Sequence, residues 1–278
     1  MNFLRIESVS DERIRPYVGL SSRQLRNLLQ PENAQVILES LLVLQVALEE
    51  GVELLSVLVD ERHAKKLCEQ ISQLEDLDIP IYVASREVLS GITGINVTRG
   101  YLACAKRPRP LSQDELLERS RRLVVLEGLT DVSNVGAVFR SAAALGADGL
   151  LLAPSCADPL NRRSIRVSMG TLFKLPWARA EGKWPGDTFD RLGSRGFKTV
   201  ALALSESARP VDQVRRELDQ TGEEGRTALF FGTEGTGLTN EVLERCDYHA
   251  IIPMERGVDS LNVAASSAVA CYALFGGR

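Results

Sequence analysis

The chain has 278 residues, of which 44% are hydrophobic and 25% are charged, so it can bury a large core and fits two domains better than one. Its formal charge of -4 excludes a general attraction to nucleic acid, and a polyanionic partner must be held by a local basic patch. The N-terminal residues carry charges too early for a secretory signal, and no apolar run approaches the roughly 18 residues of a membrane span, so we expect a cytoplasmic protein.

The first block, residues 1–107, is predicted to be a small α/β domain that includes an N-terminal extension, residues 1–24. Apolar residues over 33–51 follow a helical spacing that ends at Gly51. Beyond this helix we expect strands at residues 53–60, 79–84 and 99–106, and helices at residues 61–74 and 86–92.

A charged segment with two prolines follows at residues 106–122, and it is typical of a linker, which we place at residues 108–119. The pattern then restarts in a second domain, residues 120–278. Its apolar runs lie at residues 123–129, 149–154, 198–204, 227–232 and 249–254. Because these runs are apolar on both faces and are separated by helical stretches, we predict an α/β domain with a parallel sheet and helices on both faces.

The cysteines and histidines do not form a metal-binding pattern. There are two histidines, and the five cysteines are widely spaced without a CxxC pair: Cys68, Cys104, Cys156, Cys246 and Cys271. We therefore expect free, mostly buried thiols and no bound metal.

Ligands of parallel α/β sheets bind beyond the carboxyl ends of the strands, and three such ends are notable here. After the run at 123–129, Ser133 or Asn134 can cap a helix, and Gly136 lets another group approach the backbone. Arg140 follows in a helix whose neighbouring residues are mostly small. A surface arginine on an amphipathic helix is the alternative interpretation of this segment.

The second strand end is rich in glycine. Gly232, Gly235 and Gly237 surround Glu234. Their order is GxxGxG rather than the GxGxxG of dinucleotide-binding folds, and no phosphate-loop lysine is present. Taken alone, the segment is equally well explained as a turn into a helix.

The third strand end leads into a helix of small residues that starts near Leu261. Ser260 is positioned to cap this helix near Leu261, and Asn262 lies in its first turn, where exposed amides favour polar or anionic groups. A tightly packed core helix is the alternative explanation.

In this order and spacing, the three segments resemble the motifs of the SpoU/TrmH family of RNA 2'-O-ribose methyltransferases, within the SPOUT superfamily. The motifs are NVGAVFR at residues 134–140, FFGTEGTGL at 230–238 and IIPMERGVDSLNVAASSA at 251–268. The resemblance implies that the C-terminal domain carries a deep trefoil knot, which is rare among folds. It also implies that residues 25–107 are the small α/β RNA-binding domain found in many members.

The resemblance further implies that the cofactor is S-adenosyl-L-methionine, held by the loops of the knot chiefly through backbone groups. Carried over by position, its contacts fall on Gly232, Ile252 and Leu261, and the bend after Met254 wraps around it. The small-residue helix that starts near Leu261 is then expected to pack against the knot and against the second subunit of a homodimer.

In the same way, the resemblance assigns the catalytic site to Arg140, with Asn134, Glu234, Ser260 and Asn262 completing it. The reaction is attack of a ribose 2'-hydroxyl on the methyl group of the cofactor, and it requires no metal. A guanidinium group is effectively always protonated, so Arg140 is better suited to clamp the neighbouring phosphate than to act as a base.

RNA binding needs local basic groups because the whole chain is acidic. Arg162, Arg163 and Arg166 cluster between the first two motifs, and a second cluster lies at Lys106, Arg107 and Arg109. These groups are candidates for phosphate contacts, with solvated loop charges as the alternative.

Three classes of function are therefore compared. The first is S-adenosylmethionine-dependent methylation of a ribose 2'-hydroxyl in ribosomal RNA, with transfer RNA as the nearest substitute. The second is a catalytically silent RNA-binding relative. The third is a dinucleotide-dependent oxidoreductase, which lacks the expected glycine order and the acidic residue about 20 positions later.

Overall fold

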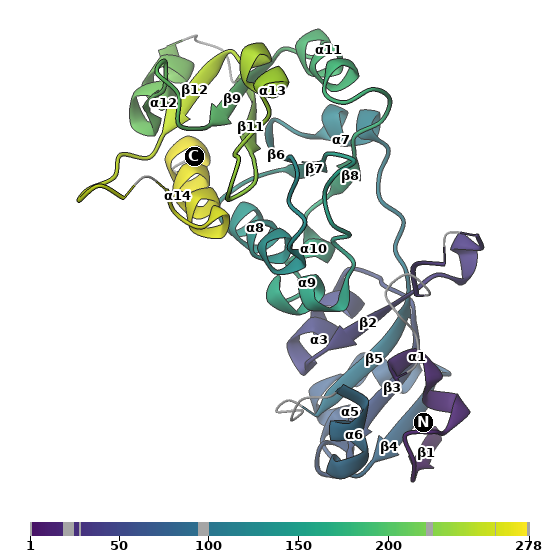
Figure 1. Cartoon of the computed structure of the whole chain (residues 1–278). Coiled ribbons are helices and arrows are strands. Elements are labelled where there is room, and N and C mark those ends of the chain that lie inside the picture. Colours follow the sequence, from purple (N-terminus) through teal and green to yellow (C-terminus); the bar gives the residue numbers. More distant parts are fainter. Residues whose placement is uncertain are drawn as a thin grey trace. The chain divides into compact units, whose positions relative to one another are not determined.

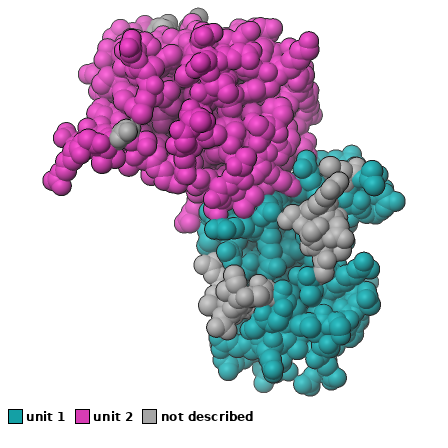
Figure 2. Space-filling view, viewed as in Figure 1, with its two compact units in different colours: residues 1–109, 160–173 teal, residues 110–159, 174–278 magenta. Residues whose placement is uncertain are grey.

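The computed structural model describes residues 2–18, 25–27, 29–93, 100–220, 225–258 and 260–276. Two compact units are present, coloured separately in Figure 2: residues 1–109 with 160–173, and residues 110–159 with 174–278. The sequence analysis placed residues 160–173 in a continuous C-terminal domain, but they pack with the first unit. The reason is that helix α9 (Arg162–Val167) lies against strand β2 (Gln35–Glu39) and buries Ile165 completely.

The first unit is built on a mixed five-stranded sheet with the strand order β1-β4-β3-β5-β2. Besides β2, its strands are β1 (Asn2–Ile6), β3 (Leu54–Asp60), β4 (Pro80–Ala84) and β5 (Tyr101–Lys106). Strands β1, β4 and β3 are parallel, whereas β5 is antiparallel to both of its neighbours. The three strands predicted in this block are confirmed.

The prediction of one helix over residues 33–51 is wrong in its first part. Residues 35–39 form β2, and helix α3 (Leu41–Glu49) begins after Ser40. Ser40 has a φ angle of 100°, which breaks the helical path, and its side chain caps α3 by accepting a hydrogen bond from the Val43 amide. Val36, Ile37 and Leu38 are buried, so pairing with β5 decides their conformation.

The other helices of the first unit are short. The predicted helix at 61–74 is instead three pieces, α4 (Glu61–Ala64), α5 (Leu67–Gln70) and the 3-10 helix η3 (Ser72–Asp76). The predicted helix at 86–92 is confirmed as α6 (Arg86–Thr93). The remaining elements are η1 (Glu12–Ile14), α1 (Arg15–Val18), η2 (Pro31–Asn33), α9 and α10 (Thr171–Lys174).

The second unit contains a seven-stranded sheet, entirely parallel, with the order β10-β12-β9-β11-β6-β7-β8 (Figure 1). Its strands are β6 (Arg122–Leu126), β7 (Gly149–Leu152), β8 (Trp177–Arg179), β9 (Phe197–Leu202), β10 (Arg209–Pro210), β11 (Arg226–Phe231) and β12 (Tyr248–Ile251). The five predicted strands are confirmed. Strands β8 and β10 escaped prediction because three and two residues are too short for a pattern.

Helices cover both faces of this sheet. They are α7 (Gln113–Arg119), α8 (Val132–Ala144), α11 (Gly186–Ser194), α12 (Val211–Gln220), α13 (Asn240–Arg245) and α14 (Val263–Phe275). In β6, Leu123 and Val125 join a core cluster with residues of α7, α11 and α13. Val124 and Leu126 point to the opposite face, where both are also fully buried. The knot stays a prediction, because strand order and register do not define the path of the chain through its loops.

Helix α7 lies inside the segment predicted as a linker. Ser112 and Glu115 form a capping box at its start: the Glu115 amide donates to Ser112 Oγ at 3.2 Å, and the Ser112 amide donates to Glu115 Oε2 at 2.9 Å. The helix therefore has a defined beginning, with its N-cap two residues after Pro110.

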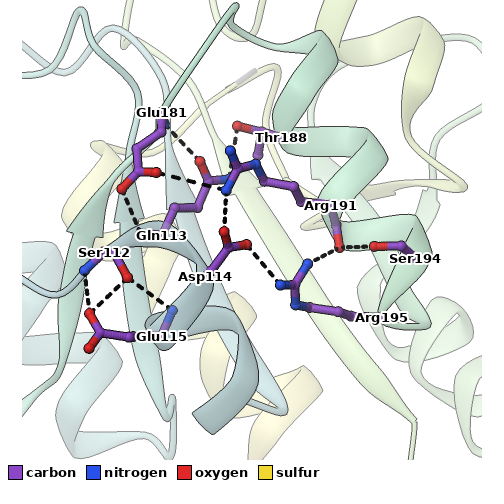
Figure 3. Close-up of polar contacts among 9 residues, drawn as sticks. All are labelled: Ser112, Gln113, Asp114, Glu115, Glu181, Thr188, Arg191, Ser194 and Arg195. Carbon is purple, nitrogen blue, oxygen red and sulfur yellow. Dashed lines mark hydrogen bonds and ion pairs between the residues drawn. The ribbon is translucent and has the colours of Figure 1, made fainter.

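Polar contacts then join α7 to the second unit, as Figure 3 shows. Asp114 accepts hydrogen bonds from Arg191 of α11 and from Arg195, the C-cap of that helix, at 2.6 and 2.8 Å. Gln113 is fully buried and accepts from the Glu181 amide at 2.7 Å. Residues 113–119 are thus a folded part of the second unit.

None of the helices in the described ranges is long and apolar enough to cross a membrane.

Candidate active site

The first motif lies at the start of α8. Asp131 is the N-cap of this helix, and its carboxylate accepts a hydrogen bond from the Ser133 amide at 2.6 Å. The prediction that Ser133 or Asn134 caps the helix is therefore wrong. Both residues occupy the first turn, which leaves the Asn134 side chain available to reach another segment.

The second motif is a loop that folds back on itself after β11. Thr233 and Gly237 exchange backbone hydrogen bonds of 3.0 and 3.1 Å. A Cβ atom at Gly232 would lie 2.1 Å from the carbonyl carbon of Gly237, so only glycine fits at this position. The tight loop presents Glu234 at its tip, with an exposed carboxylate.

The third motif connects β12 to α14. Asn262, rather than Ser260, is the N-cap of α14, and its Oδ1 accepts from the Ala264 amide at 2.9 Å. The predicted position of Asn262 in the first turn is corrected accordingly. Helix α14 packs along α8, side by side in Figure 1, which brings the third motif next to the first.

Three side chains, one from each motif, form a single hydrogen-bonded cluster. Asn134 Nδ2 donates to Glu234 Oε1 at 2.9 Å. Asn262 Nδ2 donates to Asn134 Oδ1 at 3.2 Å and also contacts Glu234 Oε1. The two amides thereby orient the carboxylate without neutralising its charge.

A cavity of about 340 Å³ opens beside this cluster, at the carboxyl ends of β9, β11 and β12. All four residues predicted to hold a cofactor line it, together with Glu234 and Ser260: Gly232, Ile252, Met254 and Leu261. The rest of the lining combines hydroxyl-bearing and apolar side chains: Thr233, Thr236 and Ser266, with Leu202, Ala203, Leu204, Phe231, Leu238, Leu243, Ala250, Ile251 and Val263. Three segments that are far apart in sequence therefore share one pocket.

The chemistry of the lining limits what the cavity can hold. Among its described side chains, Glu234 is the one ionisable group, and no lysine or arginine takes part. A ligand with a pyrophosphate would find no basic side chain in this lining. The apolar walls, exposed strand-end backbone and single carboxylate fit a nucleoside that carries a positive charge.

Arg140 does not line the cavity. It is exposed on α8, and none of the described residues forms a hydrogen bond or an ion pair with it. An exposed guanidinium without a protein partner keeps all its donors available for an external anion.

The predicted RNA-binding arginines have unequal environments. Arg162 Nε donates to Glu39 Oε2 at 3.2 Å, and Arg166 Nη1 donates to Glu39 Oε1 at 3.4 Å. These two side chains are therefore engaged within the first unit, whereas Arg163 is exposed. Lys106 also has a partner, Glu53, at 3.2 Å. RNA contacts by this group of residues stay a prediction.

Sequence reasoning missed Glu127, which follows β6 and connects it to the segments at Trp184 and Thr239. Its side chain is buried and accepts hydrogen bonds from the Thr239 amide at 2.8 Å and from Trp184 Nε1 at 2.7 Å. The available signal was an acidic residue at the end of the apolar run 123–126, where a buried carboxylate requires dedicated donors. No group of three or more potential metal ligands occurs within the described part of the chain.

Comparison with known proteins gives consistent matches. The model of the SpoU rRNA Methylase family matches residues 121–272. A protein of Mycobacterium bovis named as an uncharacterized tRNA/rRNA methyltransferase is 36% identical over 94% of this chain and 88% of its own length. A 23S rRNA (guanosine(2553)-2'-O)-methyltransferase of Bacillus subtilis is 27% identical over 71% of this chain and 73% of its own. A crystal structure of an rRNA methyltransferase from Sinorhizobium meliloti, 20% identical, shares the fold with a TM-score of 0.77, covering 99% of this chain and 98% of that one.

Proposed function

Because the chain belongs to the SpoU rRNA methylase family, we propose that it transfers a methyl group from S-adenosyl-L-methionine to a ribose 2'-hydroxyl of ribosomal RNA. The observation that carries this proposal is the cluster of Asn134, Glu234 and Asn262 at the edge of a cavity that all the predicted cofactor-binding residues line. One residue of each motif takes part, so the arrangement depends on all three.

Gly232, Ile252, Met254 and Leu261 would hold the cofactor, and they suit it. The apolar side chains of the lining fit its adenosine. The cofactor is positively charged and has no phosphate group, so the nearby carboxylate of Glu234 complements it. When bound, S-adenosylmethionine supplies an activated methyl group, so the reaction requires neither a metal nor a covalent enzyme intermediate.

Arg140 holds the acceptor strand in this proposal. Its guanidinium is exposed and has no partner among the described residues, and it can donate two parallel hydrogen bonds to the phosphate beside the target ribose. Because the group stays protonated, the hydroxyl proton leaves to the substrate or to water. Asn134 and Asn262 keep Glu234 oriented, and Ser260 completes the polar edge of the site.

Calorimetry tests the cofactor directly. The protein should bind S-adenosylmethionine and not NAD, since the described lining offers no cation for a pyrophosphate. Binding of NAD alone would favour an oxidoreductase instead. Binding of neither would favour a catalytically silent RNA-binding relative.

Ribosomal RNA is proposed as the substrate because relatives such as the Bacillus subtilis enzyme are named for it. Ribose methylation should be mapped across total RNA from cells with and without the protein. A mark that disappears from ribosomal RNA supports the proposal, and one that disappears from transfer RNA identifies the alternative substrate.

We also propose a cytoplasmic homodimer formed through α14. One face of this helix is unpartnered in the single chain, with Tyr272 69% and Val269 40% exposed. A second copy of α14 would cover these side chains. Sedimentation of the wild type and of Tyr272→Lys measures how much dimer each forms.

The four cysteines whose side chains are described are all free, the form that a reducing cytoplasm maintains.

A further inference from the structure

One wall of the cavity is a loop, residues 203–208, between β9 and β10. Ala203 and Leu204 of this loop line the cavity, and Leu204 remains 60% exposed. The loop is attached at its start by the Ala203 amide, which donates to the Ala250 carbonyl at 3.1 Å. Beyond Leu204 its position depends on side chains, because a turn this short has few backbone partners.

His249 of β12 lies behind this loop and holds it. Ser205 Oγ is 2.8 Å and Ser207 Oγ is 3.0 Å from His249 Nδ1, and the two hydroxyls are 3.3 Å apart. On the other side of the ring, His249 Nε2 is 2.9 Å from the carbonyl oxygen of Leu243. Leu243 belongs to α13 and also lines the cavity.

These contacts determine which nitrogen of the ring carries hydrogen. A carbonyl oxygen accepts and cannot donate, so Nε2 must be the donor to Leu243. In the neutral ring Nδ1 is then an acceptor, and the Ser205 and Ser207 hydroxyls share its single lone pair. One imidazole thus connects two walls of the cavity, the one at Leu243 and the one at Leu204.

We propose that His249 is a positioning residue for the cofactor, which acts by holding the 203–208 loop so that Leu204 closes the apolar wall around the nucleoside. This inference rests on the proposed function, since it concerns the same cavity. It assigns His249 no contact with the cofactor and no part in proton transfer.

Two substitutions of His249 test its two sets of hydrogen bonds separately, those of Nδ1 to the serines and that of Nε2 to Leu243. In His249→Asn, the side-chain oxygen can replace Nδ1 as the acceptor for the serines, whereas in His249→Gln the amide nitrogen can replace Nε2 as the donor to Leu243. The double variant Ser205→Ala/Ser207→Ala removes the loop contacts and leaves the ring intact. The chain has two histidines, so His63→Gln in the first unit is a matched control.

The test measures the dissociation constant of S-adenosylmethionine by calorimetry and the single-turnover methylation rate at saturating cofactor. We expect His249→Gln and the double serine variant to raise the dissociation constant about five- to tenfold, with rates within about twofold of the wild type. His249→Asn should bind S-adenosylmethionine with nearly the affinity of the wild type, and His63→Gln should bind it as the wild type does. Adding the serine substitutions to His249→Gln should cause no further loss.

Hydrogen exchange gives a second measurement that does not need the cofactor. The amides of residues 203–208 should exchange faster in His249→Gln and in the double serine variant than in the wild type. Unchanged affinity and unchanged exchange in both variants would overturn the inference while the proposed function stands. A wild-type protein that does not bind S-adenosylmethionine would instead overturn the proposed function, and the inference with it.

Discussion

Two glutamates of this protein stand among polar side chains from distant segments, yet their surroundings differ in charge. Glu39 in the first unit accepts hydrogen bonds from two guanidiniums, Arg162 and Arg166. Glu234 in the second unit is exposed and is held by two neutral amides, Asn134 and Asn262. The carboxylate of the first cluster has cationic partners within the protein, whereas the second cluster keeps a net negative charge beside a cavity. The difference indicates which carboxylate stabilises the fold and which is available to a substrate or cofactor.

The arginines give the sharpest test of this comparison. We expect Arg140→Lys to reduce single-turnover methylation roughly a hundredfold or more, because lysine keeps the charge but loses the two-pronged hydrogen bonding of the guanidinium. Arg166→Lys should leave the rate within about twofold, since its partner is Glu39. Near-normal turnover by Arg140→Lys would contradict the proposal that the unpaired guanidinium of Arg140 holds the substrate.

Glu234→Gln tests the second cluster itself. Asn134 and Asn262 both donate to the same oxygen, Oε1, so the glutamine carbonyl can still accept from them, and the substitution removes chiefly the negative charge. We expect the methylation rate to fall about tenfold or more, with the melting temperature nearly unchanged because the site is exposed. A variant that melts earlier but methylates normally would assign Glu234 to the fold instead.

Glu39→Gln should give the opposite pattern. Glu39 has little exposed side-chain surface, 15%, and glutamine would keep one accepting oxygen but turn an amide donor toward the other arginine and remove the negative charge between the two. We expect the free energy of unfolding to fall by about 1–2 kcal/mol, measured with urea, without a direct effect on cofactor affinity. A loss of affinity at unchanged stability would contradict the structural role given to this cluster.

Thr233→Val has a smaller expected effect. Thr233 Oγ1 accepts from the Thr236 amide at 3.1 Å, and its methyl group lies over Gly128, where a Cβ would be 2.7 Å away. Valine keeps the packing but removes the hydroxyl from the loop that presents Glu234. We expect the dissociation constant of S-adenosylmethionine to rise about threefold, and Thr233→Ser, which retains the hydroxyl, should stay closer to the wild type.

The thiols should behave alike in both units and so provide a baseline for these variants. Burial raises the pKa of Cys104 in the first unit and of Cys246 and Cys271 in the second to about 12. Because the thiolate is the reactive form, brief alkylation of the native protein at pH 8 should barely label them, and labelling should rise when the protein is unfolded. Peptide mass spectrometry resolves each cysteine, and fast native labelling of a variant would report local opening.

The sequence by itself determined most of the second unit and the composition of its site. Five of its strands are apolar on both faces, and this pattern is local, so the sequence was sufficient to predict them. Part of the cavity and the three members of the cluster, among them Gly232, Glu234 and Asn262, lie in the short motifs, whereas Leu204 and Leu243 of the cavity lie outside them. These motifs sit at strand ends, where the topology of a parallel sheet leaves few places for a ligand.

The tertiary structure decided everything that depends on a distant partner. Residues 35–39 have helical spacing, but they form a strand because β5 is beside them. Arg162 and Arg166 form ion pairs because residues 160–173 pack with the first unit, and His249 connects two walls because the 203–208 loop and α13 meet at its ring. No local pattern encodes such pairs, since their energy arises when segments far apart in sequence are brought into contact.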